Sequence, residues 1–575
     1  MAARLVSSPR LRSRAWFILP ILLFGVSAAL TSPPFIGDTE VYAHQVEQVH
    51  SGTLPGTALW ECGHILWRPL AYLLSPIFLR VVPDGVAWSQ KVKIIYGLIS
   101  INLICTAFSV AAVFDLSRRI LGRLWPAMVA AVLFVWGDAV LAYSQSGSSY
   151  CIALALLVAG IWWQMVYRQD SLVHAAGPGI LIGLAALFWL PFVLVIPAAA
   201  CAGKFAPLPD GSREDVPWLH VIVIAGAAAA MVLTGLAAGA ALGGVRSASD
   251  FLAWFTASKH EWSQNRQWIR AISGCARLFI DLGNDGVFLK RFTFKDPYNP
   301  VSALDLFRYG LGKIALFYAF LASIGWLASR SLLSRRSLAV LLLAAVPVLF
   351  FAVFLFEPSS PERFLPALPF LLITLAAAWD APGRATPVLR GVVLGFAMLL
   401  PVVNWPTFAG SFSPQRRRVH AQIADFRAHA GPRDVLVAVS AYEPLFQTVI
   451  NPLDPMNRTG EVTAYALVNA SARDASLWRA RFAGFVLNTW NEGRDIWIAK
   501  AGMAGRPESG SLWVEGDNPA VRWPDVAAFL HGLEFDGQTR LPDGFVRLRH
   551  SAAAVVQFDR LRTGSPMPPG SQGGF

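Results

Sequence analysis

The chain has 575 residues, of which 55% are hydrophobic and only 15% are charged. A soluble globular protein carries about 25% charged residues, so this composition excludes a simple soluble domain and indicates a helical protein that crosses a membrane repeatedly. A formal charge of +12 would suit a nucleic-acid partner in a soluble chain. In a membrane protein lysine and arginine collect in cytoplasmic loops, so we expect no nucleic-acid partner.

The first apolar segment, residues 15–30, follows four arginines and precedes no clear cleavage site. We therefore expect a retained membrane helix with a cytoplasmic N-terminus. Apolar segments recur as far as residue 405, and the placement of basic loops favours about eleven transmembrane helices. This count treats residues 177–201 as two half-length helices that turn at Trp189, because broken helices are tolerated where they line a cavity.

The predicted organisation is a polytopic α-helical domain over residues 1–405, a soluble α/β domain over 406–562 and a disordered tail over 563–575. Two long loops interrupt the helical domain, at 32–91 and 243–304. The charge pattern places both loops and the C-terminal domain on the outer side of the membrane. The second loop interleaves tryptophan with basic residues, as interfacial helices do.

The C-terminal domain shows mixed local patterns. Residues 434–441 carry alternating β-branched side chains and predict a strand. Residues 481–489 and 511–516 are also predicted as strands, whereas 416–430 and 521–533 are predicted as helices. The five cysteines show no metal-ligand spacing. Cys62 and Cys275 lie in loops assigned to one side of the membrane, so a disulfide could join them.

The loop after the first helix concentrates ionisable side chains beside aromatic ones. Residues 36–45 read I-G-D-T-E-V-Y-A-H-Q, and residues 60–74 read W-E-C-G-H-I-L-W-R-P-L-A-Y-L-L. Ionisable groups this close to a membrane are costly unless they face a water-filled site. We therefore interpret this loop as the candidate active site. Its candidate side chains include Asp38, Glu40, His64 and Arg68.

Four patches occur in a characteristic order: G-D-T-E-V-Y (37–42), G-H-I-L-W-R-P-L-A-Y-L-L (63–74), A-Y-S-Q-S-G-S-S-Y (142–150) and E-R-F-L-P-A-L-P-F-L-L (362–372). Together they resemble the GT-C superfamily of membrane glycosyltransferases, in particular the protein O-mannosyltransferases and the lipid A aminoarabinose transferases. The resemblance covers roughly the first four hundred residues. It implies a membrane enzyme that takes a sugar from a polyprenyl-phosphate donor.

In such families the acidic residue of the first loop deprotonates the acceptor or binds a metal beside the donor, and the resemblance places that role on Asp38. Independently, an acceptor hydroxyl that attacks a sugar needs a base within hydrogen-bond reach. Inversion at the anomeric carbon needs one base and no enzyme nucleophile. The alternative for Asp38 is a plain helix cap or a surface carboxylate.

Asp138 and Glu40 are the candidates for a second acidic residue or a ligand of a divalent cation, Mg or Mn. The family often has an acidic or basic residue directly after Y-S-Q, where this chain has Ser146. Asp138 comes earlier in the chain and could equally be a carboxylate at the end of a loop. A site with two carboxylates is therefore an open alternative rather than an expectation.

A carrier phosphate needs cations or oriented amide groups. Relatives often place a lysine at the turn of the central hairpin, where this chain has Trp189. The candidates for donor contact are His64, Arg68, Arg363, Lys290 and Arg291, together with Trp189 at the turn. The cations could instead pair with protein carboxylates or with lipid headgroups.

The sequence thus predicts an inverting glycosyltransferase of a bacterial inner membrane. It would move a hexosyl or pentosyl group to a protein, lipid or cell-wall glycan at the outer face. The alternatives are a polytopic transporter or lipid flippase, and a non-catalytic assembly subunit. Transporters usually carry charges in mid-span and inverted repeats, whereas the carboxylates of this chain gather at one end of the predicted helices.

Overall fold

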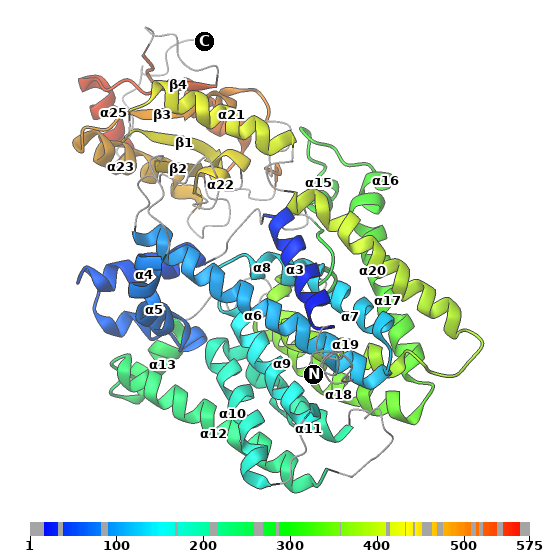
Figure 1. Ribbon diagram of the computed structural model, residues 1–575. Helices are drawn as coiled ribbons and strands as arrows, with labels where there is room; N and C mark the ends of the chain where they lie inside the picture. The colour runs from blue at the N-terminus through cyan, green and yellow to red at the C-terminus, as the bar shows by residue number, and fades with distance from the viewer. Residues whose placement is uncertain are drawn as a thin grey trace, which may run out of the picture. The chain divides into compact units, whose positions relative to one another are not determined.

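The computed structural model describes residues 16–563 except for 33–37, 82–89, 167–170, 206–215, 258–267, 269, 283–286, 357, 410–413, 432, 441–442, 451–462, 469–474, 508–512, 517–520 and 537–543 (Figure 1). The chain forms two compact units. Unit 1 comprises residues 1–83, 90–282 and 311–409, and unit 2 comprises 84–89, 283–310 and 410–575. Residues 283–310 group with unit 2, although the sequence assigns 283–304 to an outer loop of the helical domain and 306–310 to the start of its next helix.

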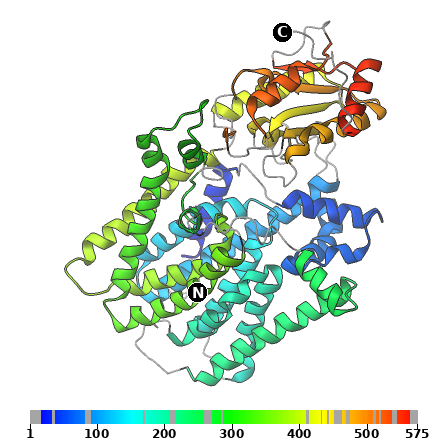
Figure 2. The ribbon, with the colours of Figure 1, turned by 180° about the vertical axis from the view of Figure 1, so that it is seen from behind.

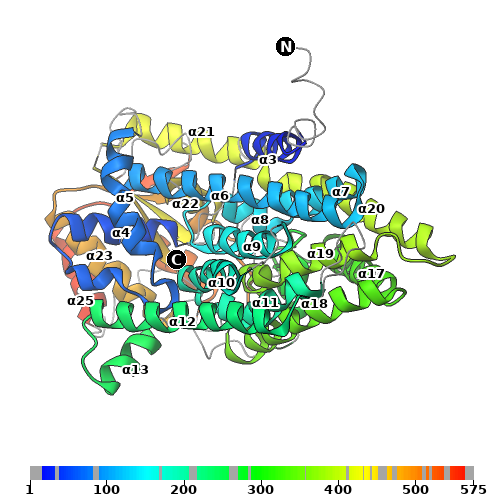
Figure 3. The ribbon, with the colours of Figure 1, turned by 60° about the horizontal axis from the view of Figure 1, so that its bottom comes forward.

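Unit 1 is helical. Its α-helices are α3 (Ile18–Leu30), α4 (Thr39–His50), α5 (Trp67–Val81), α6 (Gln90–Leu121), α7 (Leu124–Val135), α8 (Asp138–Ser144), α9 (Tyr150–Val166), α10 (Leu172–Phe188), α11 (Ile196–Phe205), α12 (Trp218–Leu242), α13 (Ala248–Ala257), α14 (Arg270–Arg277), α17 (Gly312–Ala328), α18 (Leu332–Phe350), α19 (Leu368–Ala378) and α20 (Thr386–Phe408). Short 3₁₀ turns are η1 (Gly56–Leu59), η2 (Cys62–His64), η3 (Leu190–Val195) and η7 (Pro361–Ala367). The long helix α6 contacts α3, α4, α5, α7, α8, α9 and α19, so it is the central element of this unit (Figures 1 and 3).

Six helices in the described part of the chain are long and apolar enough to cross a membrane. The number rises to seven if α7 and α8, which are bent by 64°, count as one broken span. Four further apolar helices are shorter: α3, α9, α10 and the segment Leu190–Phe205. Unit 1 is therefore a polytopic helical membrane domain. The expected count of eleven spans would need these shorter helices as well and stays a prediction.

The predicted break within residues 177–201 is confirmed. α10 ends at Phe188, Trp189 is extended, and the 3₁₀ turn η3 begins at Leu190. Pro191 lies in the first turn of η3, where its missing N–H costs no helical hydrogen bond. Trp189 is buried at this break and becomes part of the interior of unit 1.

A second break separates α7 from α8, and a buried asparagine of α20 forms hydrogen bonds with backbone groups at this break. Asn404 Nδ2 donates hydrogen bonds to the carbonyls of Trp136 (2.7 Å) and Phe279 (2.8 Å). Its Oδ1 accepts a hydrogen bond from the backbone N–H of Asp281 at 2.9 Å. One side chain thus partners three backbone groups that no helix satisfies, which is required for irregular backbone inside a membrane domain.

Unit 2 contains a four-stranded sheet with strand order β2-β1-β3-β4. The strands are β1 (Val435–Ser440), β2 (Thr463–Val468), β3 (Ile496–Ala499) and β4 (Phe545–Arg547); β1 pairs in parallel with β2 and β3, and β4 pairs antiparallel with β3. The helices are α15 (Val287–Phe294), α16 (Ala303–Leu306), α21 (Pro414–His429), α22 (Pro444–Ile450), α23 (Trp478–Asn491), α24 (Trp523–His531) and α25 (Ala552–Thr563).

Helices cover both faces of this sheet (Figure 2). Val437 and Val439 of β1 belong to a core shared with α23, α24 and α25, whereas Leu436 belongs to a core shared with α21 and α22. Successive side chains of a strand point to opposite faces, so β1 is buried on both sides. The predictions of β1, α21 and α24 are confirmed, and α24 ends at Gly532 as expected.

Two strand predictions in unit 2 are wrong. Residues 481–489 lie within α23, because Phe482, Val486 and Trp490 are buried and their spacing of four residues forms one helical face. The described residues of 511–516 form no strand and end in a turn. Both segments are short apolar runs, for which periodicity does not separate helix from strand.

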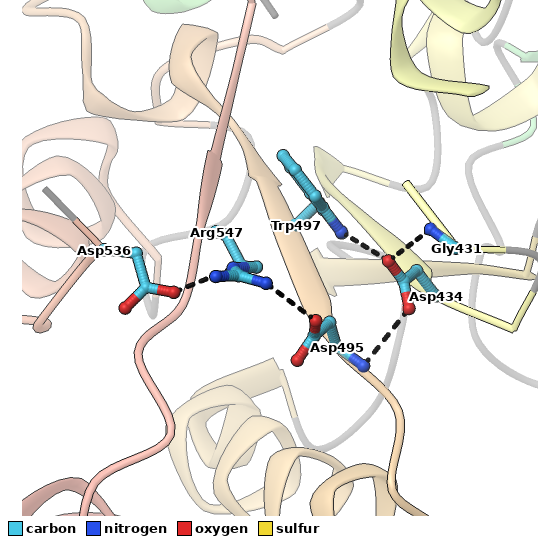
Figure 4. Close-up of polar contacts among 6 residues, drawn as sticks. All are labelled: Gly431, Asp434, Asp495, Trp497, Asp536 and Arg547. Atoms are coloured by element: carbon cyan, nitrogen blue, oxygen red, sulfur yellow. Dashed lines mark hydrogen bonds and ion pairs between the residues drawn. The ribbon is translucent and has the colours of Figure 1, made fainter. Parts of the chain in front are cut away.

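A polar network ties the strand starts of unit 2 together (Figure 4). Asp434 Oδ2, just before β1, accepts hydrogen bonds from Gly431 N (2.7 Å) and Trp497 Nε1 (2.9 Å). Arg547 of β4 donates to Asp495 Oδ2 (3.0 Å), just before β3, and to Asp536 Oδ2 (2.7 Å). These contacts lie where parallel strands begin, opposite the edge at which such sheets usually bind ligands, so we assign them a structural role.

Replacement of Asn404 by leucine should destabilise unit 1, because it removes the side-chain partner of the Trp136 carbonyl and of the Asp281 N–H and leaves the Phe279 carbonyl with the Asp138 N–H alone. Each unpaired group costs about 1–3 kcal/mol. Thermal unfolding of the detergent-solubilised protein measures the loss. The control is Val402→Leu on the same helix, at a side chain that is 68% exposed in the protein. An Asn404→Leu melting curve that overlays the Val402→Leu curve would contradict this account of the break.

Candidate active site

Asp38 occupies the N-cap position of α4 and is half-buried. Its carboxylate makes no capping hydrogen bond to that helix, so capping does not explain the residue. Asp38 is therefore a half-buried carboxylate that its own helix does not use.

His64 lies in the turn η2 and is buried. Its Nδ1 is 2.7 Å from Ser149 Oγ and 3.2 Å from the carbonyl oxygen of Phe188. Its ring packs edge-on against Tyr42, with the ring centroids 5.7 Å apart. His64 thus joins the first loop both to the segment before α9 and to the broken end of α10.

Arg68 is buried in the first turn of α5 and forms an ion pair with Glu61. Its guanidinium carbon lies 5.3 Å from the centre of the Tyr42 ring. Burial raises the pKa of Tyr42 well above its usual value, and the negative charge of Asp38 raises that pKa further. Asp38 and Arg68 therefore act on the same phenol with opposite charges.

Arg363 is buried in η7 between two aromatic rings. Its guanidinium carbon is 3.8 Å from the ring centre of Phe356 and 5.5 Å from that of Trp189. Its Nη2 is 3.5 Å from Glu362 Oε1, and Glu362 Oε2 accepts a hydrogen bond of 2.5 Å from the Tyr143 hydroxyl. The helix break at Trp189 and the patch at 362–372 thus meet at this arginine.

Tyr150 connects the two arginine environments. Its ring centroid lies 6.2 Å from that of His64, 4.7 Å from that of Tyr143 and 4.7 Å from that of Trp189. The charged groups that act on its hydroxyl are those of Glu362, Arg363, Asp38 and Glu61. We name this assembly the Tyr150 cluster; it comprises Asp38, Tyr42, Glu61, His64, Arg68, Tyr143, Tyr150, Trp189, Glu362 and Arg363.

The remaining predicted residues have other surroundings. Glu40 lies in the first turn of α4, and its carboxylate binds Lys91 Nζ at 2.9 Å. Lys290 and Arg291 lie on α15 in unit 2, where Arg291 Nε is 3.6 Å from Asp296 Oδ2. Burial lowers the pKa of Arg291. A donor-binding role of these two cations stays a prediction.

Asp138 belongs to a second polar cluster. It is buried at the start of α8, and the charges acting on it are those of Asp281, Arg277 and Lys313. Lys313 Nζ donates to the carbonyl oxygen of Asp281 at 2.9 Å, and Thr407 hydrogen-bonds the Asp281 carboxylate. Asp138 thus has two protein cations and a second carboxylate as charged neighbours.

A divalent cation does not fit the donor groups present. Across the described residues, no group of three or more His, Cys, Asp or Glu side chains could hold a metal ion. The two candidate ligands also have other neighbours, since Glu40 pairs with Lys91 and Asp138 lies beside Arg277 and Lys313. No step of the mechanism proposed below is assigned to Mg or Mn.

All five cysteines are free thiols, and no disulfide joins Cys62 to Cys275. Burial raises the pKa of each of these two thiols to about 12. The first and second loops of unit 1 are instead connected by a hydrogen bond of 2.7 Å from Trp254 Nε1 to the carbonyl of Trp60.

Sequence reasoning missed Tyr42, Tyr143, Tyr150 and Glu362 as members of the site. All four lie inside the patches that carry the resemblance, but no role was assigned to them. The signal in the sequence was Glu362 beside Arg363 at the start of an apolar segment. A charge in that position needs a partner from another helix. Which partner it finds, here Tyr143, depends on packing rather than on local sequence.

No family model and no curated protein matches the chain. Among solved structures it is similar to ArnT from Cupriavidus metallidurans in the apo state, with 10% sequence identity, a TM-score of 0.47 and coverage of 94% of this chain and 99% of that chain. The same protein bound to undecaprenyl phosphate matches with 11% identity, a TM-score of 0.42 and coverage of 95% and 99%. The oligosaccharyltransferase of Archaeoglobus fulgidus in the apo form matches with 12% identity, a TM-score of 0.39 and coverage of 85% and 70%.

ArnT is a lipid A aminoarabinose transferase, so the structural comparison finds one of the groups that the sequence patches resemble. Because these TM-scores are low, we derive the site and its chemistry from the residues of this chain alone.

The Glu61–Arg68 ion pair allows a stability test. Glu61→Leu should destabilise unit 1 by about 3 kcal/mol, because breaking a buried pair leaves an uncompensated charge. The double variant Glu61→Leu/Arg68→Met should unfold at a higher temperature than Glu61→Leu alone, because it removes that charge. Thermal unfolding in detergent compares the two. If the double variant unfolds at the same temperature as Glu61→Leu, or at a lower one, the ion pair is solvated.

Proposed function

We propose that unit 1 is an inverting glycosyltransferase that moves a sugar from a polyprenyl-phosphate donor to a hydroxyl-bearing acceptor at the outer face of a membrane. The observation that carries this proposal is the Tyr150 cluster. It places a carboxylate that does not cap its helix and two buried arginines around the same tyrosines. A transfer of this type needs a base for the acceptor and cations for the departing phosphate.

Asp38 is the proposed base. Its carboxylate makes no capping hydrogen bond to α4, so its oxygens can accept the proton of an acceptor hydroxyl. It acts electrostatically on Tyr42 and Tyr150, on whose hydroxyls Arg68 and Arg363 respectively also act. An acceptor hydroxyl bound beside these rings would meet the carboxylate on one side and the donor on the other.

Arg363 is the proposed contact of the donor phosphate. The rings of Trp189 and Phe356 fix the plane of its guanidinium. Within the described part of the chain, its Nε has no hydrogen-bond partner although the atom is buried. The Nε of Arg68 is likewise buried and has no hydrogen-bond partner in the described part of the chain. Buried donors without partners are costly, and a phosphate oxygen would satisfy them.

The proposed reaction is one displacement. The acceptor oxygen forms a bond to the anomeric carbon as its proton passes to Asp38. The bond between the anomeric carbon and the phosphate oxygen breaks, and the electron pair stays on polyprenyl phosphate. Because the attacking and leaving oxygens lie on opposite faces of the sugar, the configuration inverts. The arginines stabilise the charge that develops on the leaving phosphate.

This function implies a donor held by the membrane and an acceptor reached from the water side. We propose a cytoplasmic N-terminus and an extracytoplasmic unit 2 in a bacterial inner membrane, because the basic loops predict this orientation. The transferred group is a hexosyl or pentosyl unit, and the acceptor is a protein, a lipid or a cell-wall glycan. His64, through Ser149, would orient whichever group binds beside Tyr42.

Asp38→Asn should lower sugar transfer at least about 100-fold, because it removes the base but keeps the size of the side chain. Binding of the polyprenyl-phosphate donor should persist. Both are measured with radiolabelled donor and purified protein in nanodiscs. The matched control is Glu47→Gln on the same helix, whose carboxylate faces His44 at 3.6 Å and lies outside the cluster.

Wild-type transfer by Asp38→Asn would remove Asp38 from the mechanism. Lipid translocation without any transfer, in the wild-type protein, would favour a flippase.

Arg363→Met should raise the donor KM about 10- to 100-fold, because a charge-assisted hydrogen bond to phosphate is lost. The matched control is Arg390→Met. Arg390 also packs on a tryptophan, at 5.8 Å from the ring of Trp379, and also has an acidic neighbour, Asp380, but it lies outside the Tyr150 cluster. An unchanged donor KM in Arg363→Met would assign the phosphate to other cations.

A further inference from the structure

We propose that residues 145–149, which connect α8 to α9, form a positioning loop that holds the proposed base in place through its main chain. Thr39, Gly147 and Asn102 are the positioning residues, and none of them need touch substrate. This inference rests on the proposed function, because it assumes that Asp38 is the base. It adds a role to a segment in which the sequence shows only small polar side chains.

The central contact joins the loop to the residue after Asp38. The backbone N–H of Gly147 donates a hydrogen bond of 2.8 Å to Thr39 Oγ1, and Thr39 is fully buried. The fit leaves no space for a side chain at Gly147. A Cβ atom there would lie 2.4 Å from Thr39 Cγ2 and 2.9 Å from Leu98 Cβ. The position of Thr39, and hence that of the Asp38 backbone, is fixed by direct contact with this peptide.

The loop itself is held by two other helices. Asn102 on α6 is fully buried, and its Nδ2 donates to the carbonyls of Ser146 (2.7 Å) and Ser148 (2.6 Å). Trp67 Nε1 donates to the carbonyl of Gly147 at 2.8 Å. Donors from two different helices therefore bind three successive carbonyls. The loop has no regular hydrogen-bonding pattern of its own, so these side chains determine its shape.

The two ends of the loop bind further parts of unit 1. Gln145 Nε2 donates to Thr31 Oγ1 (2.7 Å) at the end of α3, and Ser149 Oγ contacts His64 Nδ1 (2.7 Å). Five consecutive residues thus bind the end of α3, the residue after Asp38, the residue before Arg68, and His64 itself. A single rigid segment sets the relative positions of the base, one arginine and the histidine.

Such an arrangement affects the chemical step more than binding. A displacement of about 1 Å between a base and the atom it acts on can cost about 100-fold in rate. Arg363, the first proposed contact of the donor phosphate, lies on η7 and makes none of these contacts. Arg68 follows Trp67, whose hydrogen bond to the Gly147 carbonyl does not involve Thr39. Loss of the Thr39 contact should therefore lower kcat for sugar transfer and leave the donor KM near its wild-type value.

The test compares Thr39→Val with Thr39→Ser. Valine keeps the shape of threonine but removes the acceptor of the Gly147 N–H, so kcat should fall about 10- to 100-fold, with the donor KM within about twofold of wild type. Serine keeps the hydroxyl and should recover most of the lost kcat. Both are assayed well below their melting temperatures in nanodiscs. Equal kcat values for the valine and serine variants would overturn the inference.

A second pair of variants tests the loop if Thr39→Val does not fold. Gly147→Ala should lower kcat, and the double variant Gly147→Ala/Thr39→Ser should regain part of it, because serine lacks the methyl group that a Cβ at Gly147 would strike. No recovery in the double variant would overturn the steric account. If Asp38→Asn abolishes transfer while the loop variants act as wild type, only this inference fails; if Asp38→Asn transfers normally, the proposed function fails first.

Discussion

A backbone group that leaves a helix at membrane depth has no water to bind, so it must find a partner inside the protein. Unit 1 meets this constraint with single buried side chains. Asn404 partners the break between α7 and α8, and Asn102 partners two carbonyls of the loop 145–149. His64 lies beside the last carbonyl of α10. Asn102 and His64 also lie in or next to the candidate site, whereas Asn404 binds the backbone of Asp281 in the second polar cluster. Part of the site therefore depends on the hydrogen bonds that hold the fold.

The charges of the site follow a related rule. Each buried arginine has a carboxylate neighbour and an aromatic face: Arg68 has Glu61 and Tyr42, and Arg363 has Glu362 and Trp189. The carboxylates offset the cost of burying a cation, and the rings fix its direction. A cation that is both neutralised and oriented can bind an anion without reorganising its surroundings first, which is the requirement for electrostatic catalysis.

The general plan of unit 1 could be predicted because long apolar segments, basic loops and the tryptophan–proline break are local signals. The sequence also identified Asp38, His64, Arg68 and Arg363, which the structure gathers in one cluster. It could not predict the bond between Tyr143 and Glu362, since these residues are 219 positions apart and meet only through packing of η7 on α8. The surroundings of Asp138 could not be predicted either, because its charged neighbours Arg277, Asp281 and Lys313 lie far away in the chain, and its role as a second acidic residue stays a prediction.

The buried thiols have a practical consequence. The reactive form of cysteine is the thiolate, and burial that holds the pKa of Cys62 and Cys275 near 12 leaves almost none of it at neutral pH. Maleimide reagents should therefore label these native positions slowly. The wild-type chain is then a quiet background for single cysteines introduced in exposed loops, and the side from which an impermeant maleimide reaches each one reports the membrane orientation of the chain.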